Sequence, residues 1–218
     1  GMFECEGVRK GEAWEPNTIY PKAVTWVSNP KSAIQIPNFG MRVYLTGFMA
    51  SGKSTVGPRV AARLGCTFLD LDRLIAVHEG RSIPSIFAED GEERFRELET
   101  QALHQTVEQD DLVVALGGGA LVDAENRAFA KEHGRVVYLA VDAETVFARV
   151  GDEADQRPLL QAEDGTPLSG AAMQGRVEGM LSERADAYTE AHVTVDAMGA
   201  VSEVVDAVTA AVRETDRG

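Results

Sequence analysis

The sequence predicts an α/β domain in which a parallel sheet is covered by helices on both faces. From Met41 onward, short β-rich segments alternate with helical segments, and the β-rich segments are apolar without strict alternation. Strand–helix alternation favours parallel strands joined by crossover helices. Continuously apolar strands are typical of a sheet that is buried on both faces. A phosphate-binding motif at residues 47–54, described below, fits this class of fold.

The expected elements follow in chain order. Strands are predicted at residues 42–46, 66–71, 112–116, 136–140 and 192–195. Helices are predicted at residues 53–64, 91–107, 120–132, 144–150, 173–187 and 201–212. In the last helix the valines recur at three- and four-residue intervals, which places them on one apolar stripe that faces the core.

Composition limits the classes of function. The 218 residues carry 35 acidic and 21 basic side chains, a formal net charge of −14, which argues against duplex nucleic acid and anionic membranes as partners. Cys5 and Cys66 form no CxxC motif, so neither a disulfide scaffold nor a zinc module is expected. Apolar runs such as 112–116 are far too short to cross a bilayer. We therefore expect a cytoplasmic protein.

Residues 1–40 differ from the body of the chain, residues 41–218. They hold both tryptophans, Trp14 and Trp26, and four of the eight prolines. Spaced prolines favour an extended arm over a helix, and Gly1 before Met2 is typical of a tag remnant. The arm is either a loose leader or a segment that packs on its own body or on a neighbouring subunit. We expect a monomer, with an arm-mediated dimer as the alternative.

The strongest motif lies between the first predicted strand and the first predicted helix. It reads Gly47-Phe48-Met49-Ala50-Ser51-Gly52-Lys53-Ser54 and fits G-x-x-x-x-G-K-[ST]. Its glycines let the backbone curl so that successive N–H groups point at phosphate oxygens, and the helix start adds further N–H groups. The Lys53 ammonium can reach the β- and γ-phosphates, and the Ser54 hydroxyl can ligate Mg²⁺. The motif indicates that the protein binds a nucleoside triphosphate.

Two carboxylates, Asp70 and Asp72, close the second predicted strand. Residues i and i+2 of a strand face the same side, and ligands bind at the carboxyl ends of strands in open α/β sheets. One carboxylate can then hold the Mg²⁺ shell while the other accepts a proton from an acceptor hydroxyl. The competing interpretation is a turn with an Asp helix cap before Arg73.

Two further segments carry polar or backbone groups suited to a ligand. Arg96 and Glu99 share one face of the predicted helix at 91–107, which taken alone is an ordinary salt-bridged helix. Three glycines at 117–119 follow a predicted core strand and precede a predicted helix. Backbone N–H groups without side chains in that position make a cradle for an anion or a hydroxyl. A flexible turn is the alternative.

Three arginines complete the set of candidates: Arg149, Arg157 and Arg184. Because the global field of an acidic protein repels ATP, arginines that meet its phosphates must be placed locally. Arg157 lies in an acidic segment, residues 151–165, and would move onto the phosphates when that loop closes. Taken singly, each arginine is more typical of a surface position.

In their order and spacing, these motifs resemble the shikimate kinase family over roughly residues 42–195. The resemblance rests on the phosphate loop, the Asp-x-Asp, Phe-Arg-x-x-Glu at 95–99, the triple glycine, Arg-Pro-Leu-Leu at 157–160 and Arg184. It implies a three-layer P-loop fold of the nucleoside-monophosphate-kinase type, with a five-stranded parallel sheet, a lid and substrate-binding helices. The implied reaction moves the γ-phosphoryl of ATP, with Mg²⁺, to the 3-hydroxyl of shikimate.

The resemblance also implies roles for individual residues. The ATP-binding residues would be Ala50, Ser51, Gly52, Lys53, Ser54, Thr55, Arg149 near the adenine, and the lid residue Arg157. The metal would be held by Ser54, with Asp70 in its outer shell. The substrate-binding residues would be Asp72, Arg96, Gly117, Gly118, Gly119, Arg184, Phe87, Phe95 and Glu99. The catalytic residues would be Lys53, Arg157 and Asp72, the last as general base.

Two other functions compete with this interpretation. A gluconate-type kinase shares the loop and the fold but does not call for the Phe-Arg-x-x-Glu helix, the triple glycine and Arg184 together. A non-catalytic nucleotide-binding module would not need Asp72 and Arg96. The chain departs from the family pattern at Ala50, where glycine is frequent, and after the last strand, where residues 196–200 lack a basic side chain near the adenine.

Overall fold

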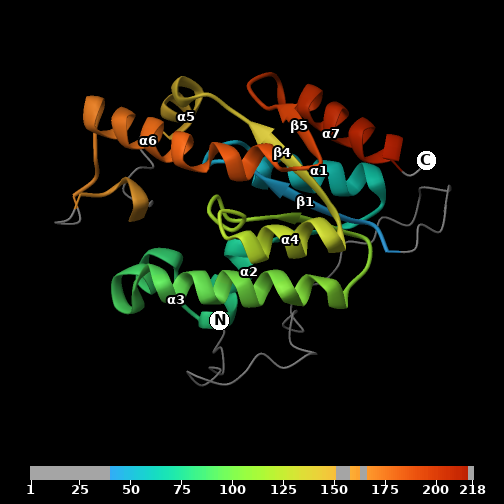
Figure 1. Ribbon diagram of the computed structural model, residues 1–218, viewed down its shortest axis with the longest axis horizontal. Coiled ribbons are helices and arrows are strands. Elements are labelled where there is room, and N and C mark those ends of the chain that lie inside the picture. The colour runs from blue at the N-terminus through green and yellow to red at the C-terminus, as the bar shows by residue number, and fades with distance from the viewer. Residues whose placement is uncertain (1–39, 151–157, 163–165, 216–218) are drawn as a thin grey trace, which may run out of the picture.

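The computed structural model describes residues 40–150, 158–162 and 166–215 and contains a five-stranded, fully parallel sheet (Figure 1). The strands are β1 (Arg42–Thr46), β2 (Thr67–Asp70), β3 (Leu112–Ala115), β4 (Arg135–Ala140) and β5 (Val193–Asp196), in the order β2-β3-β1-β4-β5. The predicted sheet is thus confirmed, with strand ends displaced by one or two residues at most. The expected arm at residues 1–40 and the segment around Arg157 lie almost entirely outside the described residues.

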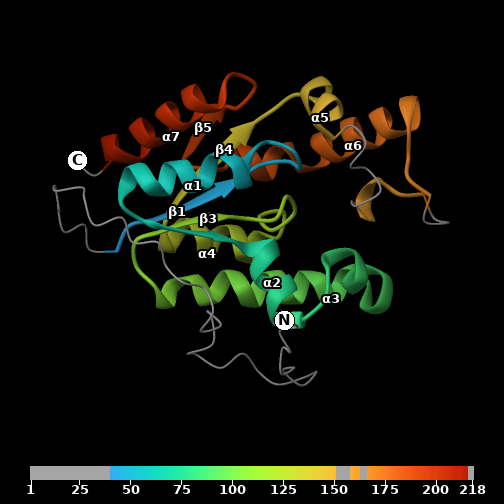
Figure 2. The same cartoon turned by 180° about the vertical axis from the view of Figure 1, so that it is seen from behind.

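Helices cover both faces of this sheet, as predicted. They are α1 (Lys53–Leu64), α2 (Leu71–Glu79), α3 (Ile83–Gln105), α4 (Ala124–His133), α5 (Ala143–Val150), α6 (Gly170–Thr189) and α7 (Val201–Thr215), with short 3-10 turns at η1 (Thr106–Glu108) and η3 (Pro158–Leu160). In Figures 1 and 2, α1 and α7 lie on one side of the sheet, and α3 and α4 lie on the other. The result is a three-layer α/β arrangement.

The alternation of side chains along each strand builds two separate cores. In β1, Val43 and Leu45 pack with α1, α6 and α7, whereas Tyr44 between them packs with α2, α3 and α4. In β3, Val113 and Val114 divide in the same way. All five side chains are fully buried. Burial on both faces explains why these strands are continuously apolar.

Two helical segments were not predicted, and both are fixed by capping side chains. The Asp70 carboxylate accepts a hydrogen bond from the Arg73 amide and so caps α2, while the Ser82 hydroxyl does the same for the Ser85 amide at the start of α3. The predicted helix start at residue 91 coincides with a kink: Gly91, with φ of 83°, is non-helical and separates the two helical segments that make up α3. A left-handed φ interrupts helical geometry and suits glycine.

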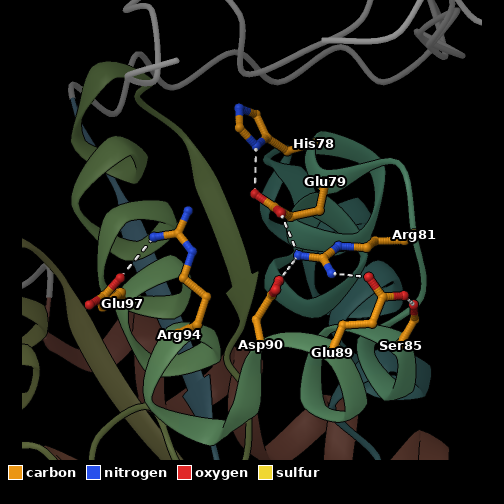
Figure 3. Close-up of polar contacts among 8 residues, drawn as sticks. All are labelled: His78, Glu79, Arg81, Ser85, Glu89, Asp90, Arg94 and Glu97. Atoms are coloured by element: carbon orange, nitrogen blue, oxygen red, sulfur yellow. Dashed lines mark hydrogen bonds and ion pairs between the residues drawn. The ribbon is translucent and has the colours of Figure 1, made fainter. Parts of the chain in front are cut away.

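A cluster of charged residues ties the end of α2 to the first part of α3. Figure 3 shows the Arg81 guanidinium between the carboxylates of Glu79, Glu89 and Asp90. Its nitrogens lie 3.2 Å from Glu79 and 2.9 Å from Glu89, and the Arg81 side chain is only 14% exposed. We call this group the Arg81 cluster. It fastens the segment before the Gly91 kink to the preceding helix.

None of the helices in the described part of the chain has the length and apolarity that a bilayer crossing would need.

Candidate active site

The phosphate loop lies at the carboxyl end of the central strand β1 and runs into α1 (Figure 1). Gly52 has φ of 96°, a left-handed conformation that glycine adopts without strain. Ala50 also has a positive φ, of 57°, a left-handed conformation in which glycine would be less strained. The loop therefore adopts the curled backbone that the motif predicts.

The Lys53 ammonium lies against this loop. Its Nζ atom donates hydrogen bonds to the carbonyl oxygens of Gly47, at 2.7 Å, and Phe48, at 2.9 Å. Ser51 is buried, and its hydroxyl lies 3.4 Å from the same ammonium. A positive charge is thus held over the loop at the first residue of α1, where the helix dipole also favours anions.

The two side chains predicted to hold Mg²⁺, Ser54 and Asp70, lie next to each other beside the loop. The Ser54 hydroxyl donates a 2.6 Å hydrogen bond to the Asp70 carboxylate. Among the described residues, no cluster of three or more His, Cys, Asp or Glu side chains could hold a metal ion on its own. A hydroxyl and a carboxylate next to a phosphate loop nevertheless fit Mg²⁺, which keeps several waters and takes further oxygens from substrate phosphates.

The placement of Asp70 and Asp72 on one strand face is wrong. Asp70 is the last residue of β2, where it caps α2, and Asp72 belongs to the first turn of that helix. The helix-cap interpretation is therefore correct for Asp70. Both carboxylates still line the same cleft as Lys53. The two carboxylates are brought into one cleft by the first turn of α2, and not by the alternation of side chains along a strand.

The cleft has a volume of about 540 Å³ and gathers most of the predicted nucleotide-binding residues. Among the residues that line it are Ala50, Ser51, Gly52, Lys53, Ser54, Thr55, Asp70, Asp72, Gly118 and Arg149. Its far side is formed by the turn after β5 and the start of α7, with Ala197, Gly199, Val201 and Val204. Ala197 and Gly199 belong to the segment at 196–200 that the family resemblance places near the adenine, whereas Val201 and Val204 were not predicted.

Arg149, at the end of α5, joins the two sides of this cleft. It donates hydrogen bonds to the carbonyl oxygens of Ala50, at 3.2 Å, and Ala197, at 2.8 Å. The guanidinium therefore lies where the phosphate loop meets the β5–α7 turn, away from Asp72 on the other side of the loop.

The glycine turn, residues 117–119, lies against the side chains predicted to bind the acceptor substrate. A β-carbon at Gly117 would approach Asp72 Oδ1 to 3.1 Å and collide with Glu99 Oε1. One at Gly119 would lie 2.6 Å from Arg96 Nη1. We expected a helix to begin directly after the turn, at residue 120. The structure differs, because α4 begins only at Ala124. Close approach of neighbouring side chains instead accounts for the glycines at 117 and 119.

Arg96 and Glu99 form a buried ion pair beside this turn. Arg96 Nη1 lies 2.7 Å from Glu99 Oε2, and the Glu99 side chain is 1% exposed. Burial raises the pKa of Glu99 to about 7, although the neighbouring Arg96 guanidinium opposes the shift. Glu92, on the exposed side of the helix, holds the same guanidinium at 2.9 Å. Arg96 is therefore held from two sides with one edge toward Gly119.

Arg184 reaches the same turn from α6. Its Nη1 atom lies 3.4 Å from the Gly118 carbonyl oxygen, which also accepts a 2.5 Å hydrogen bond from the Tyr188 hydroxyl. Arg96 and Arg184, 88 positions apart in the sequence, thus meet the glycine turn from different helices, next to Asp72. Tyr188 was not among the predicted site residues.

Two aromatic rings lie on α3, one before and one after the Gly91 kink. The ring centroids of Phe87 and Phe95 are 4.8 Å apart, and the Arg96 guanidinium lies 5.3 Å from the Phe95 centroid. Phe95 is buried, whereas Phe87 is partly exposed. The predicted lid residue Arg157 lies outside the described residues.

Comparison with known proteins identifies the family of this chain. The family model described as shikimate kinase matches residues 49–213. The chain belongs to the shikimate kinase family. A shikimate kinase of Salinibacter ruber is 60% identical over 177 residues, which are 80% of this chain and 87% of the relative.

Solved structures agree with this family and bear on the competing interpretation. A shikimate kinase from Acinetobacter baumannii, solved in complex with shikimate, is 35% identical with a TM-score of 0.73 and covers 81% of this chain and 95% of its own. A gluconokinase from Sinorhizobium meliloti matches 81% of this chain and 94% of its own, with a TM-score of 0.52 and 17% identity. The second likeness shows a shared fold alone.

Proposed function

We propose that this member of the shikimate kinase family transfers the γ-phosphoryl group of ATP to the 3-hydroxyl of shikimate. One observation carries the proposal: two guanidinium groups from separate helices meet a glycine turn beside Asp72, at the edge of a phosphate-loop cleft. A ring acid with several hydroxyls needs a planar cationic fork for its carboxylate and a nearby base for the reacting hydroxyl.

The nucleotide binds along the phosphate loop. Backbone N–H groups of residues 50–55 hold the phosphates, and the Lys53 ammonium moves from loop carbonyls to the β- and γ-phosphate oxygens. Arg149 lies on the adenine side of the cleft, between the loop and the β5–α7 turn. Arg157 acts as the lid residue on the phosphates. Phosphoryl transfer depends mainly on such positioning and charge neutralisation.

Ser54 would hold Mg²⁺ directly, and Asp70 would hold it through a bound water. The metal would supply positive charge that neutralises the phosphates of the nucleotide. The 2.6 Å hydrogen bond between the two side chains keeps both oxygens at the mouth of the loop.

The acceptor lies between α2, α3 and α6. Arg96 and Arg184 bind its carboxylate, Phe87 and Phe95 border the ring, and backbone groups of the glycine turn bind its hydroxyls. Asp72 accepts the proton of the 3-hydroxyl as the new oxygen–phosphorus bond forms and the bond from the γ-phosphorus to the β-phosphate oxygen breaks. Glu99 holds Arg96 in place. Because one chain supplies all these groups, we expect a monomer to be active.

A coupled assay of ADP release tests the function. The protein with ATP and Mg²⁺ should release ADP when shikimate is added, and the product should carry phosphate on the 3-hydroxyl. ADP release with gluconate but not with shikimate would favour the gluconate-type kinase. Saturable nucleotide binding without ADP release from any hydroxy acid would favour a non-catalytic module. Either result would overturn the proposal.

A further inference from the structure

The last turn of α6 carries a buried tyrosine that touches the active site through one atom. Tyr188 is 1% exposed, and its ring stacks on Tyr138 of β4 with centroids 4.9 Å apart and planes 16° apart. Its hydroxyl donates a 2.5 Å hydrogen bond to the Gly118 carbonyl oxygen. Burial raises the pKa of Tyr188 to about 12, so the hydroxyl keeps its proton and remains a donor at neutral pH.

Gly118 occupies the point where both halves of the site meet. A β-carbon there would lie 3.4 Å from the Met49 amide nitrogen and 3.5 Å from the Gly47 carbonyl oxygen, so the residue packs directly on the phosphate loop. In a planar trans peptide the carbonyl and the following N–H point in opposite directions. Fixing the Gly118 carbonyl on α6 therefore also fixes the direction of the Gly119 N–H, beside Arg96.

The same carbonyl has a second neighbour. Arg184, one helical turn before Tyr188, lies 3.4 Å from it. This contact is a longer hydrogen bond that Arg184 donates, and the guanidinium also interacts with the Tyr188 hydroxyl. Tyr188 supplies the shorter of the two hydrogen bonds to the carbonyl, so the other N–H groups of Arg184 stay able to bind a carboxylate. A carbonyl without the tyrosine would draw the guanidinium toward itself, because buried acceptors require a donor.

We propose that Tyr188 is a positioning residue for the acceptor substrate, which holds the Gly118 carbonyl so that the glycine turn and Arg184 stay in their binding arrangement. The inference rests on the proposed function, since it names the residue that orders the shikimate-binding groups. It places the effect of Tyr188 on the acceptor rather than on the nucleotide.

Replacement of one hydroxyl tests the proposal. We expect Tyr188→Phe to raise KM for shikimate about 3–10-fold, the equivalent of one net hydrogen bond, while KM for ATP changes less than about twofold. Tyr138→Phe is the matched control, because it removes a hydroxyl from the other ring of the same stack. It should leave both KM values within about twofold. Thermal unfolding of each variant reports on folding.

A second variant restores a hydrogen-bond donor at position 188 and so distinguishes loss of the hydrogen bond from a change in ring packing. With 4-aminophenylalanine at position 188, the N–H group should bring KM for shikimate back to within about threefold of the starting value. An unchanged KM for shikimate in Tyr188→Phe, an equal rise for both substrates, or no recovery with the amino group would overturn the inference. Absence of shikimate turnover in the unaltered protein would instead overturn the proposed function.

Discussion

Glu99 is a carboxyl group almost without access to water, and its protonation is linked to stability. Its pKa rises from 4.5 to about 7 because burial disfavours the charged form. The folded chain therefore holds this proton in a pH range where the unfolded chain has released it. The contribution of Glu99 to the free energy of unfolding is therefore fully present below pH 4.5. It decreases as the pH rises toward 7, by about 1.4 kcal/mol per pH unit at most.

Substitution of Glu99 by glutamine should remove this dependence. We would measure the unfolding free energy of the unaltered protein and of Glu99→Gln by urea unfolding at several pH values. The first value minus the second should decrease as the pH rises from 4.5 to 7. Glu92→Gln is the control, since its exposed carboxylate binds the same Arg96 guanidinium from the solvent side. A difference that stays flat or rises with pH would contradict the burial argument.

Lys53 carries the residue-scale prediction for catalysis. We expect Lys53→Ala to lower kcat with shikimate by about 10²–10³-fold, because one preorganised positive charge on the transferring phosphoryl is lost. Lys131→Ala on α4, whose ammonium lies 4.0 Å from Glu190, serves as control and should leave kcat within about twofold. Near-normal turnover in Lys53→Ala would remove the phosphate loop from the mechanism.

At the residue scale, sequence reasoning finds side chains whose chemistry is distinctive. Lys53, Asp72 and Arg96 are identified because a motif places each beside a recognisable neighbour. Tyr188 is missed because nothing in the sequence marks a buried tyrosine that binds a carbonyl 70 residues away. Val201 and Val204, on the same side of the cleft as Ala197, are also missed, because apolar side chains carry no chemical signal.

At the scale of elements, the Arg81 cluster determines how firmly α3 is attached. Arg81→Ala would remove the guanidinium that lies between the carboxylates of Glu79, Glu89 and Asp90 (Figure 3). We expect a loss of about 1–3 kcal/mol of unfolding free energy, or about 2–4 °C in Tm for each kcal/mol. Because Phe87 lies on this segment, KM for shikimate should rise while KM for ATP does not.

Arg94→Ala provides the comparison for this prediction. Arg94 also pairs with a carboxylate, Glu97, but both side chains are largely exposed, at 37% and 55%. Exposed pairs contribute little, so the change in unfolding free energy should stay within about 0.5 kcal/mol. Equal melting temperatures for the two variants would show that the Arg81 cluster does not hold the segment.

The elements that sequence patterns miss are those set by local capping. Helix α2 follows β2 without a connecting residue, and Asp70 belongs to both as strand end and helix cap. A carboxylate at that position fits a strand pattern and a cap equally well, so the pattern alone cannot choose. The helical segment before the Gly91 kink is missed in the same way, because its start depends on the Ser82 cap.

At the scale of the whole molecule, we propose residues 41–218 as the working unit. A chain that begins at Met41 should fold and keep kcat and both KM values within about twofold, because the described cores and the cleft come from residues beyond 40. Gel filtration and the shikimate assay check this. Loss of turnover or of an oligomer on removal of residues 1–40 would assign the arm a part in the active protein.

The overall architecture is the part that sequence patterns predict best. Each strand is a short apolar run followed by a helical pattern, so its type, order in the chain and parallel direction follow from burial on two faces and from crossover geometry. The arrangement β2-β3-β1-β4-β5 does not follow, since apolar strands of similar composition can exchange neighbours. The resemblance to a known family predicts the fold type and five parallel strands, and the order of the strands comes from the structure.

The tight fit of the glycine turn has a consequence for how this enzyme could change its acceptor. At Gly117 and Gly119 even a methyl group would overlap a neighbouring side chain. Mutation of these positions therefore offers no gradual route to a larger or smaller ring. A descendant with altered preference would have to acquire it through the long side chains of α3 and α6, with the backbone between them left as it is.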